Sequence, residues 1–156
     1  MDPLGLEYRR VDPGDPAVAA LIARHAAHGD AHYPSESNHH QDGAAMAACG
    51  VILFAGLSDG IAVAMGGYKV IAPGEGEVKS MHVTEAARGQ GAGARILKMI
   101  VDHARDRGLC RLSLETGSHE ASAAARRLYE RAGFSYCAPF GGYVDDPMSV
   151  FMTRAL

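Results

Sequence analysis

One stretch of the sequence constrains the fold more than any other, because it joins a strand-like run to closely spaced glycines and a helical pattern. Residues 77–83 read Glu-Val-Lys-Ser-Met-His-Val, a run compatible with a β-strand. Gly89, Gly91 and Gly93 follow, just before apolar residues at helical spacing. Glycines there let backbone N–H groups approach a ligand, and the first helical turn adds unpaired donors and partial positive charge. The stretch therefore predicts an anion site at the start of a helix.

Phosphate suits this loop best, since Arg88 adds a fixed positive charge with a bidentate fork. A dinucleotide and an acyl-coenzyme A both carry such phosphates. The G-x-G-x-x-A spacing that begins at Gly89 satisfies the dinucleotide rule, and Glu115 falls near the place of its ribose-binding acid. In a dinucleotide fold, however, the first glycine follows the strand almost directly, whereas residues 84–88 intervene here. Too little chain follows for a second mononucleotide half, so an acyl-coenzyme A is favoured.

Two motifs in the second half of the chain resemble the GNAT N-acetyltransferase superfamily. Arg88-x-x-Gly91-x-Gly93 is similar to its pyrophosphate loop. Residues 125–134, Ala-Arg-Arg-Leu-Tyr-Glu-Arg-Ala-Gly-Phe, resemble its helix with Leu-Tyr shortly before Gly-Phe. Many members have Asn seven residues ahead of this Tyr, where the chain has Ser122. The tail at residues 140–152, from Phe-Gly-Gly-Tyr to Phe-Met, and the Pro-Ser-Glu-Ser loop at residues 34–37 are similar to a subgroup of small-molecule acetyltransferases whose substrates are not assigned.

The resemblance implies an α/β fold of the GNAT type in one domain covering residues 1–156. Its central sheet is mixed, mostly antiparallel, made of about seven strands and splayed at its middle, with helices on both faces. Hydrophobic patterning and turn residues predict strands at 6–11, 51–57, 61–71, 77–83, 110–116, 134–138 and 149–154. The same signals predict helices at 16–29, 91–107 and 121–132. Gly66 and Gly67 inside a strand predict a bulge or a close approach of another group, and residues 30–50 form the least regular segment.

Composition excludes several classes of protein. A length of 156 residues suits one domain, and a net charge of −3 does not indicate a nucleic-acid surface. The three cysteines are scattered without metal or disulfide spacing, which favours reduced thiols in the cytoplasm. We find no signal-peptide pattern and no apolar run long enough to cross a membrane.

The resemblance implies direct transfer of an acetyl group from acetyl-CoA to an amine. Tyr129, within the Leu-Tyr motif, is the candidate general acid for the leaving thiolate. Glu77 is the first candidate for the general base, because several family members place their base at this strand position. Glu115 on the neighbouring strand and the His82 side chain are further options, and packing or surface roles explain these residues equally simply.

The cofactor-binding residues implied by the resemblance fall into three groups. Backbone groups of Met81, His82 and Val83 are expected to pair with the pantetheine arm or to face the thioester oxygen. Ser122 stands where the pantetheine-contacting Asn is usual. The pyrophosphate loop comprises Arg88, Gly89, Gln90, Gly91, Ala92 and Gly93.

The acyl acceptor is expected to contact loops, which carry specificity more often than cores do. Glu36 and His39 come from the histidine-rich segment, and Phe140 and Tyr143 from a turn-rich excursion near the C-terminus. The histidine spacing matches no metal-ligand pattern, so no metal is expected. A small amine is the expected partner, and a homodimer is a family-level expectation. Two alternatives stay open, a non-catalytic acyl-CoA sensor and an acetyltransferase acting on protein lysines or N-termini.

Overall fold

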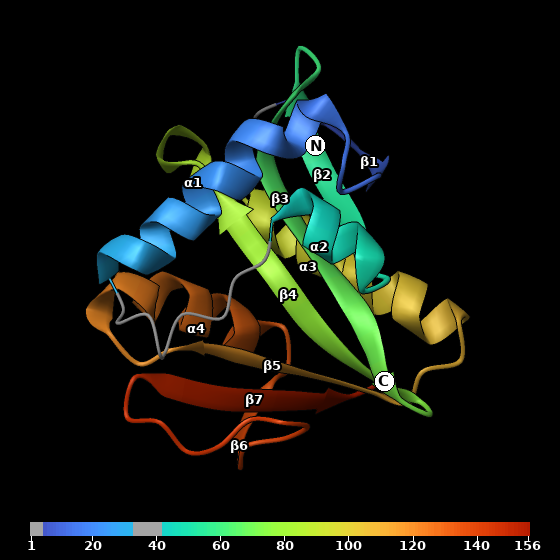
Figure 1. The fold of residues 1–156 in the computed structure, drawn as a ribbon, viewed down its shortest axis with the longest axis vertical. Helices are drawn as coiled ribbons and strands as arrows, with labels where there is room; N and C mark the ends of the chain where they lie inside the picture. The colour runs from blue at the N-terminus through green and yellow to red at the C-terminus, as the bar shows by residue number, and fades with distance from the viewer. Residues whose placement is uncertain (1–4, 33–41) are drawn as a thin grey trace.

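A computed structural model describes residues 5–32 and 42–156, with the backbone alone for residues 28–32. Seven strands form one sheet in the order β1-β2-β3-β4-β5-β7-β6 (Figure 1). All neighbouring strands are antiparallel except β4 and β5, which confirms the mixed, mostly antiparallel sheet. The strands are β1 (Glu7–Val11), β2 (Ile52–Ser58), β3 (Ile61–Ala72), β4 (Glu75–Val83), β5 (Arg111–Gly117), β6 (Ser135–Cys137) and β7 (Ser149–Ala155).

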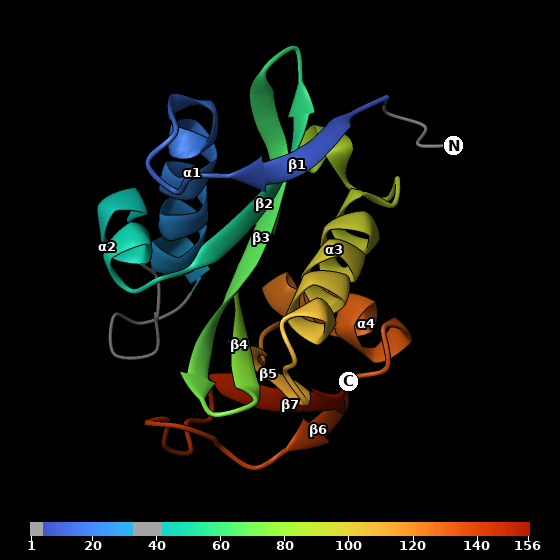
Figure 2. The ribbon, with the colours of Figure 1, turned by 90° about the vertical axis from the view of Figure 1, so that its right-hand side faces the viewer.

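Helices cover both faces of the sheet, as Figure 2 shows. On one face lie α1 (Pro16–His32) and α2 (Gly43–Ala48), and on the other α3 (Ala92–Asp106) and α4 (Ala123–Arg131). The face of α3 predicted to be apolar is buried, namely Ile96, Leu97, Ile100, Val101 and Ala104. Each face therefore has its own core, one under α1 and α2 and one under α3 and α4. None of the helices within the described ranges has the length and apolar character needed to span a membrane.

The sheet opens between its two parallel strands. β4 pairs with β5 only from Glu75 to Glu77, opposite Arg111 to Ser113. Beyond this point β4 continues with β3, while β5 continues with β7, so the two strands diverge (Figure 1). This divergence is the splay expected at the middle of the sheet, and it leaves one edge of β4 without a partner strand among the described residues.

A bulge in β4 lies at the point of divergence. Met65 pairs with His82 and Gly67 with Lys79, so two steps along β3 match three along β4. Ser80 lies in this bulge with a φ of 61°, a backbone conformation that is uncommon for a residue with a side chain. A Cβ at Gly66 would collide with the sulfur of Met81, so this glycine makes room for the Met81 side chain. The bulge predicted from Gly66 and Gly67 of β3 is thus confirmed. Its extra residue lies on β4, the strand that pairs with β3.

Two sequence-based helix assignments were wrong in extent, and one helix was missed. Helix α1 continues to His32 instead of ending at Gly29, because one glycine inside a helix costs only about 1 kcal/mol and does not by itself end the helix. Helix α2 was not predicted, although Asp42 accepts a 2.7 Å N-cap hydrogen bond from the backbone N–H of Ala45 and Met46 is fully buried. The helix predicted at 121–132 is divided into a 3-10 turn, η3 (Glu120–Ser122), and α4.

Candidate active site

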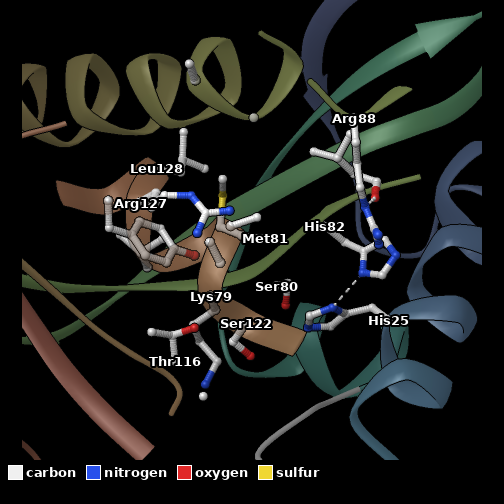
Figure 3. Close-up of a pocket in the computed structure, with 18 of the residues that line it drawn as sticks. His25, Lys79, Ser80, Met81, His82, Arg88, Thr116, Ser122, Arg127 and Leu128 are labelled. Atoms are coloured by element: carbon white, nitrogen blue, oxygen red, sulfur yellow. Dashed lines mark hydrogen bonds between the residues drawn. The ribbon is translucent and has the colours of Figure 1, made fainter. Parts of the chain in front are cut away.

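A cavity of about 690 Å³ occupies the opening between β4 and β5 (Figure 3). Its walls come from β4, from the segment between β4 and α3, from the end of β5, and from η3 and α4. His25 of α1 and two residues before β7, Tyr143 and Met148, complete the lining. The cavity therefore joins the predicted anion site to the side chains that were predicted to carry chemistry.

The glycine loop forms one part of the wall. Gly89 and Gly91 have φ values of 76° and 88°, a left-handed conformation that disfavours other residues. Gly91 is the N-cap of α3, and no side chain caps this 15-residue helix. The N–H groups of its first turn therefore lack intrahelical partners and carry the partial positive charge of the helix end. A Cβ at Gly93 would lie 3.2 Å from Leu128 Cδ2, so this glycine lets α3 and α4 approach each other.

Arginines add positive charge around the cavity. The Arg88 Nε donates a 3.1 Å hydrogen bond to the carbonyl of Val83, which holds this side chain against the end of β4 (Figure 3). Arg127 and Arg131 of α4 also line the cavity. Arg126 instead fastens α4 to the end of β5, because its Nη1 donates to the carbonyl of Gly117 at 2.7 Å. The loop and α4 thus present several cations to a bound anion.

Tyr129 is buried in the cavity wall, with 5% of its surface exposed. Its ring packs against Phe134 at 6.0 Å between centroids. We find no hydrogen bond between the Tyr129 hydroxyl and any part of the chain that the structure describes. A buried hydroxyl without a partner costs about 1–3 kcal/mol, so this group is poised to bond to a ligand. Burial raises the pKa of the Tyr129 phenol, and the charge of Glu115 raises it further, which keeps the phenol protonated at neutral pH.

Glu77 is a buried carboxylate on the same cavity. The Tyr143 hydroxyl donates a 2.5 Å hydrogen bond to Glu77 Oε2, and the Lys79 ammonium lies 3.8 Å from the same oxygen. Burial raises the pKa of the Tyr143 phenol, followed by its hydrogen bond to Glu77 and the charges of Glu77 and Glu115. Tyr143 therefore remains a hydrogen-bond donor, and Glu77 remains its acceptor.

Glu115 reaches the cavity from β5. Its Oε2 accepts a 2.6 Å hydrogen bond from the Ser149 hydroxyl of β7. Tyr129, Glu77 and Glu115 come from α4, β4 and β5, and the fold brings all three to one cavity.

Comparison with known proteins identifies the family to which this arrangement belongs. The profile of the acetyltransferase (GNAT) family matches residues 19–134. The chain belongs to this family. It is therefore an acyltransferase enzyme, and the family resemblance inferred from the loop and the Leu-Tyr helix is confirmed.

Curated relatives of this acetyltransferase are themselves named acetyltransferases. It is 38% identical over 148 residues to the IAA acetyltransferase of Azospirillum brasilense, covering 94% of this chain and 95% of that protein. It is 45% identical over 91 residues to the uncharacterised N-acetyltransferase YsnE of Bacillus subtilis. That match covers 58% of this chain and 60% of YsnE, so less than two thirds of YsnE is represented.

Solved structures share the fold of this acetyltransferase. A candidate acyl-CoA N-acyltransferase from Klebsiella pneumoniae superposes with a TM-score of 0.79 at 31% identity, over 98% of this chain and 99% of that chain. The structure of yncA, a candidate acetyltransferase from Salmonella typhimurium with its cofactor acetyl-CoA, has a TM-score of 0.71 at 21% identity, over 97% and 94% of the chains. The second likeness concerns the fold alone, and together they confirm the predicted GNAT architecture.

The structure places most residues predicted for the acetyltransferase site on the cavity. They are Glu77, Met81, His82, Val83, Arg88, Gly89, Gly91, Ala92, Gly93, Glu115, Ser122, Tyr129 and Tyr143. Gln90 instead directs its side-chain amide toward the carbonyl of Ala86 at 3.5 Å. Phe140 stands behind Tyr143, with ring centroids 5.2 Å apart, and supports that ring without lining the cavity. Glu36 and His39 lie outside the described residues.

Several side chains of the cavity were not predicted from the sequence, among them Arg127, Arg131, Lys79 and His25. Lys79 lies beside Glu77, and strand alternation from residue 77 to 79 could have placed both on one face. His25 lies in the helix predicted at 16–29, but it was not predicted to line the cavity. Its Nδ1 lies 3.1 Å from Nδ1 of His82, as the dashed line in Figure 3 shows. No sequence signal relates two histidines that are 57 residues apart.

Proposed function

We propose that this GNAT enzyme transfers the acetyl group of acetyl-CoA to the primary amine of a small molecule, such as an amino acid, an amine or a related metabolite. The transfer occurs by direct attack while both substrates are bound. One observation carries the proposal: a single cavity joins the backbone donors of the glycine loop to the buried Tyr129 hydroxyl and the buried Glu77 carboxylate. The acetyl-CoA held by the fold neighbour yncA and the acetyltransferase name of the curated relative support it.

The cofactor is held on the side of α3 and α4. The N–H groups at Gly89, Gly91 and the first turn of α3 bind the pyrophosphate, with Arg88 at the edge of the loop. Arg127 and Arg131 add positive charge on the opposite wall. The pantetheine arm pairs with the edge of β4 near Met81 and Val83, which β5 leaves without a partner strand among the described residues. An N–H at Met81 or His82 then faces the thioester oxygen and stabilises its negative charge during attack.

The acceptor amine binds on the side of Glu77. The negative charge of its carboxylate attracts an alkyl ammonium, and Tyr143 fixes its orientation through the 2.5 Å hydrogen bond. As the nitrogen attacks the thioester carbon, it becomes a strong acid, and Glu77 is placed to accept the proton that it loses at this stage. Glu115 adds a second negative charge to the cavity.

Tyr129 provides the proton that the leaving thiolate requires. Its raised pKa keeps the hydroxyl protonated at neutral pH, so a donor is always present. Because a thiol has an ordinary pKa of about 8.5, full transfer from such a phenol is unfavourable before the C–S bond breaks. Tyr129 therefore first stabilises the developing charge on sulfur by a hydrogen bond and transfers its proton as the bond breaks.

Direct attack is favoured over a covalent acetyl-enzyme. Cys49 and Cys110 are exposed, and neither they nor Cys137 lines the cavity. Burial raises the pKa of the Cys137 thiol, which lowers its fraction of reactive thiolate at neutral pH. Acetyl transfer of this kind uses no metal.

The proposal includes a homodimer in the cytoplasm. The family resemblance is the basis for the homodimer. The cysteines, which are all free in the described chain, are the basis for the cytoplasmic location. Light scattering at several concentrations tests the dimer, and a constant monomer mass would contradict it.

Coenzyme A release in the presence of an amine panel tests the proposed function. We expect release of free thiol that depends on both acetyl-CoA and one class of amine, with an N-acetyl product detected by mass spectrometry. Acetyl-CoA binding by calorimetry without any release would indicate the sensor alternative. Acetylation of lysine peptides or N-terminal peptides, but of no small amine, would replace the small-molecule acceptor with a protein one.

A further inference from the structure

We propose that His82 and His25 act as a paired base that takes the first proton from the acceptor ammonium, with His82 receiving the proton and His25 supporting it. This inference rests on the proposed function and adds two residues to its chemistry. The two Nδ1 atoms lie 3.1 Å apart, their rings meet at 80°, and both side chains line the cavity (Figure 3).

The hydrogen bond fixes what the pair can do with protons. At 3.1 Å one Nδ1 must carry the hydrogen and the other its lone pair. A neutral imidazole that carries its hydrogen on Nδ1 has a lone pair on Nε2. We assign this tautomer to His82 of β4, so that its Nε2 accepts the proton from the ammonium. A proton added at His82 Nε2 makes the bond to His25 charge-assisted and therefore stronger. A second proton would place two hydrogens between the Nδ1 atoms and break the bond, so the pair binds one proton readily and a second one poorly.

The balance of the reaction requires such a group. An alkyl ammonium and acetyl-CoA give an N-acetyl amine, free coenzyme A and one proton. The nitrogen loses two protons: one balances the proton that the sulfur gains from Tyr129, and the other must leave the cavity. The first loss creates the nitrogen lone pair and precedes attack, whereas the second accompanies attack and is assigned above to Glu77.

An imidazole suits the first step better than a carboxylate does. An alkyl ammonium has an ordinary pKa of about 10.4, an imidazole about 6.5 and a Glu carboxyl about 4.3. Proton transfer to imidazole is thus less unfavourable, and an imidazolium returns its proton to water near neutral pH. Glu77 also already accepts the hydrogen bond of Tyr143 and faces the Lys79 ammonium.

Other charged and titratable groups of the described chain line the cavity that the pair faces, and they bear on its protonation. Those that line the same cavity are Glu77, Lys79, Arg88, Glu115, Arg127, Arg131, Tyr129 and Tyr143. Lys79 and the arginines disfavour added positive charge on the pair, while the two carboxylates favour it. This arrangement is consistent with a pair that alternates between zero and one added proton.

A pH profile of the His82→Gln variant tests the proposal. We expect kcat to fall by about 100-fold at pH 7, within the range of a lost general base. The defect should shrink as pH rises, because a growing fraction of the amine then arrives already deprotonated. A purely structural role would give a defect that does not depend on pH. A His82→Gln rate within about twofold of the parent at every pH would overturn the proposal.

Two substitutions at His25 separate its hydrogen bond from its packing. Asn places an oxygen near the position of Nδ1 and can accept from His82, whereas Leu cannot. We expect His25→Leu to lower kcat about tenfold and His25→Asn to retain most activity. Arg24→Gln, at an exposed position of the same helix, is the control and should match the parent. Equal losses in the Asn and Leu variants would contradict the hydrogen-bond role.

An NMR titration of the imidazole nitrogens tests the pair without relying on activity. We expect one proton to be taken up before the other in two separate steps, and the steps to merge into one ordinary titration in His25→Leu. Independent titration of both rings would overturn the pairing. Zinc binding at these nitrogens, with loss of activity when a chelator is added, would also overturn the pairing, because the two histidines would then be metal ligands. If the parent acetylates no amine, the proposed function fails together with this inference, whereas an active parent with unaffected histidine variants defeats the inference alone.

Discussion

The Tyr143 hydroxyl donates a 2.5 Å hydrogen bond to the Glu77 carboxylate, and it joins residues 66 positions apart in the chain. Tyr143 comes from the loop before β7, and Glu77 ends the short stretch in which β4 pairs with β5. The bond therefore ties a loop near the C-terminus to the point where the sheet opens. It also orients the carboxylate to which the acceptor amine is assigned.

Replacing Tyr143 by Phe should remove this bond while the aromatic packing on Phe140 and Phe151 remains. We expect kcat/KM for the amine to fall about tenfold, because a hydrogen bond to a charged group contributes about 1.5–3 kcal/mol and water can partly replace it. Affinity for acetyl-CoA should not change. Tyr136→Phe, on a ring that is 54% exposed and outside the cavity lining, is the matched control. If the Tyr143 variant also lost affinity for acetyl-CoA, Tyr143 would belong to the cofactor half of the site, which would contradict its assignment to the acceptor half.

Replacing Tyr129 by Phe should separate catalysis from stability. The substitution removes a buried hydroxyl for which we find no partner in the described chain, so the free energy of unfolding should stay within about 1 kcal/mol or rise. Turnover should nevertheless fall by about tenfold or more, with nearly unchanged acetyl-CoA binding. Urea denaturation and steady-state rates measure the two effects. Unchanged turnover with a good substrate would remove Tyr129 from the mechanism.

The two ends of α3 offer a matched pair of glycines. Gly91, at the start, and Gly108, just past the end, have φ values of 88° and 85°, and an added Cβ would meet no atom within 4 Å at either. An alanine should destabilise the protein by about 1–2 kcal/mol at both positions, because both require a left-handed backbone. Only Gly91→Ala should weaken acetyl-CoA binding, since it disturbs the N–H groups assigned to the pyrophosphate. Equal affinities in the two variants, measured by calorimetry, would argue against this phosphate site.

Stability should fall at high pH because buried phenols resist ionisation. Burial raises the pKa of Tyr68, Tyr129 and Tyr143 in the folded state, while each titrates near about 10 when unfolded. A raised folded pKa means that the stabilisation is complete below about pH 10 and is lost as pH rises further. Each phenol contributes a slope of at most about 1.4 kcal/mol per pH unit there. Urea unfolding between pH 9 and 11 should show a shallower loss in Tyr129→Phe than in Tyr136→Phe, and equal slopes would contradict the assignment.

The sequence predicted the parts of the fold that depend on local patterns. Alternation identified the strands, and the left-handed glycines Gly89 and Gly91 identified the loop that opens α3. The family resemblance also predicted that the sheet is splayed at its middle. The boundary at Gly29 failed because one glycine is too weak a signal to end a helix, and α2 was hidden in a run of small residues whose burial depends on the sheet.

The candidate site was predictable where its residues lie within motifs. Arg88 and Tyr129 stand in such motifs, and Glu77 stands at a recognisable strand position. The partners that set their chemistry were not predictable, because they arise from tertiary contacts. Tyr143 reaches Glu77 across the C-terminal loop, Ser149 reaches Glu115, and His25 meets His82 from another helix. A single sequence does not show which residues that are far apart in the chain come into contact in the fold.

The most direct test of the central claim is a stoichiometric assay of the purified protein with acetyl-CoA and an amine panel. Free coenzyme A and the N-acetyl amine are measured in the same samples by mass spectrometry. The account predicts that at least one small primary amine yields both products in equal amounts, and that Tyr129→Phe forms them about tenfold or more slowly. Release of coenzyme A that does not depend on any amine, or an acetylated product formed at the same rate by Tyr129→Phe, would contradict it.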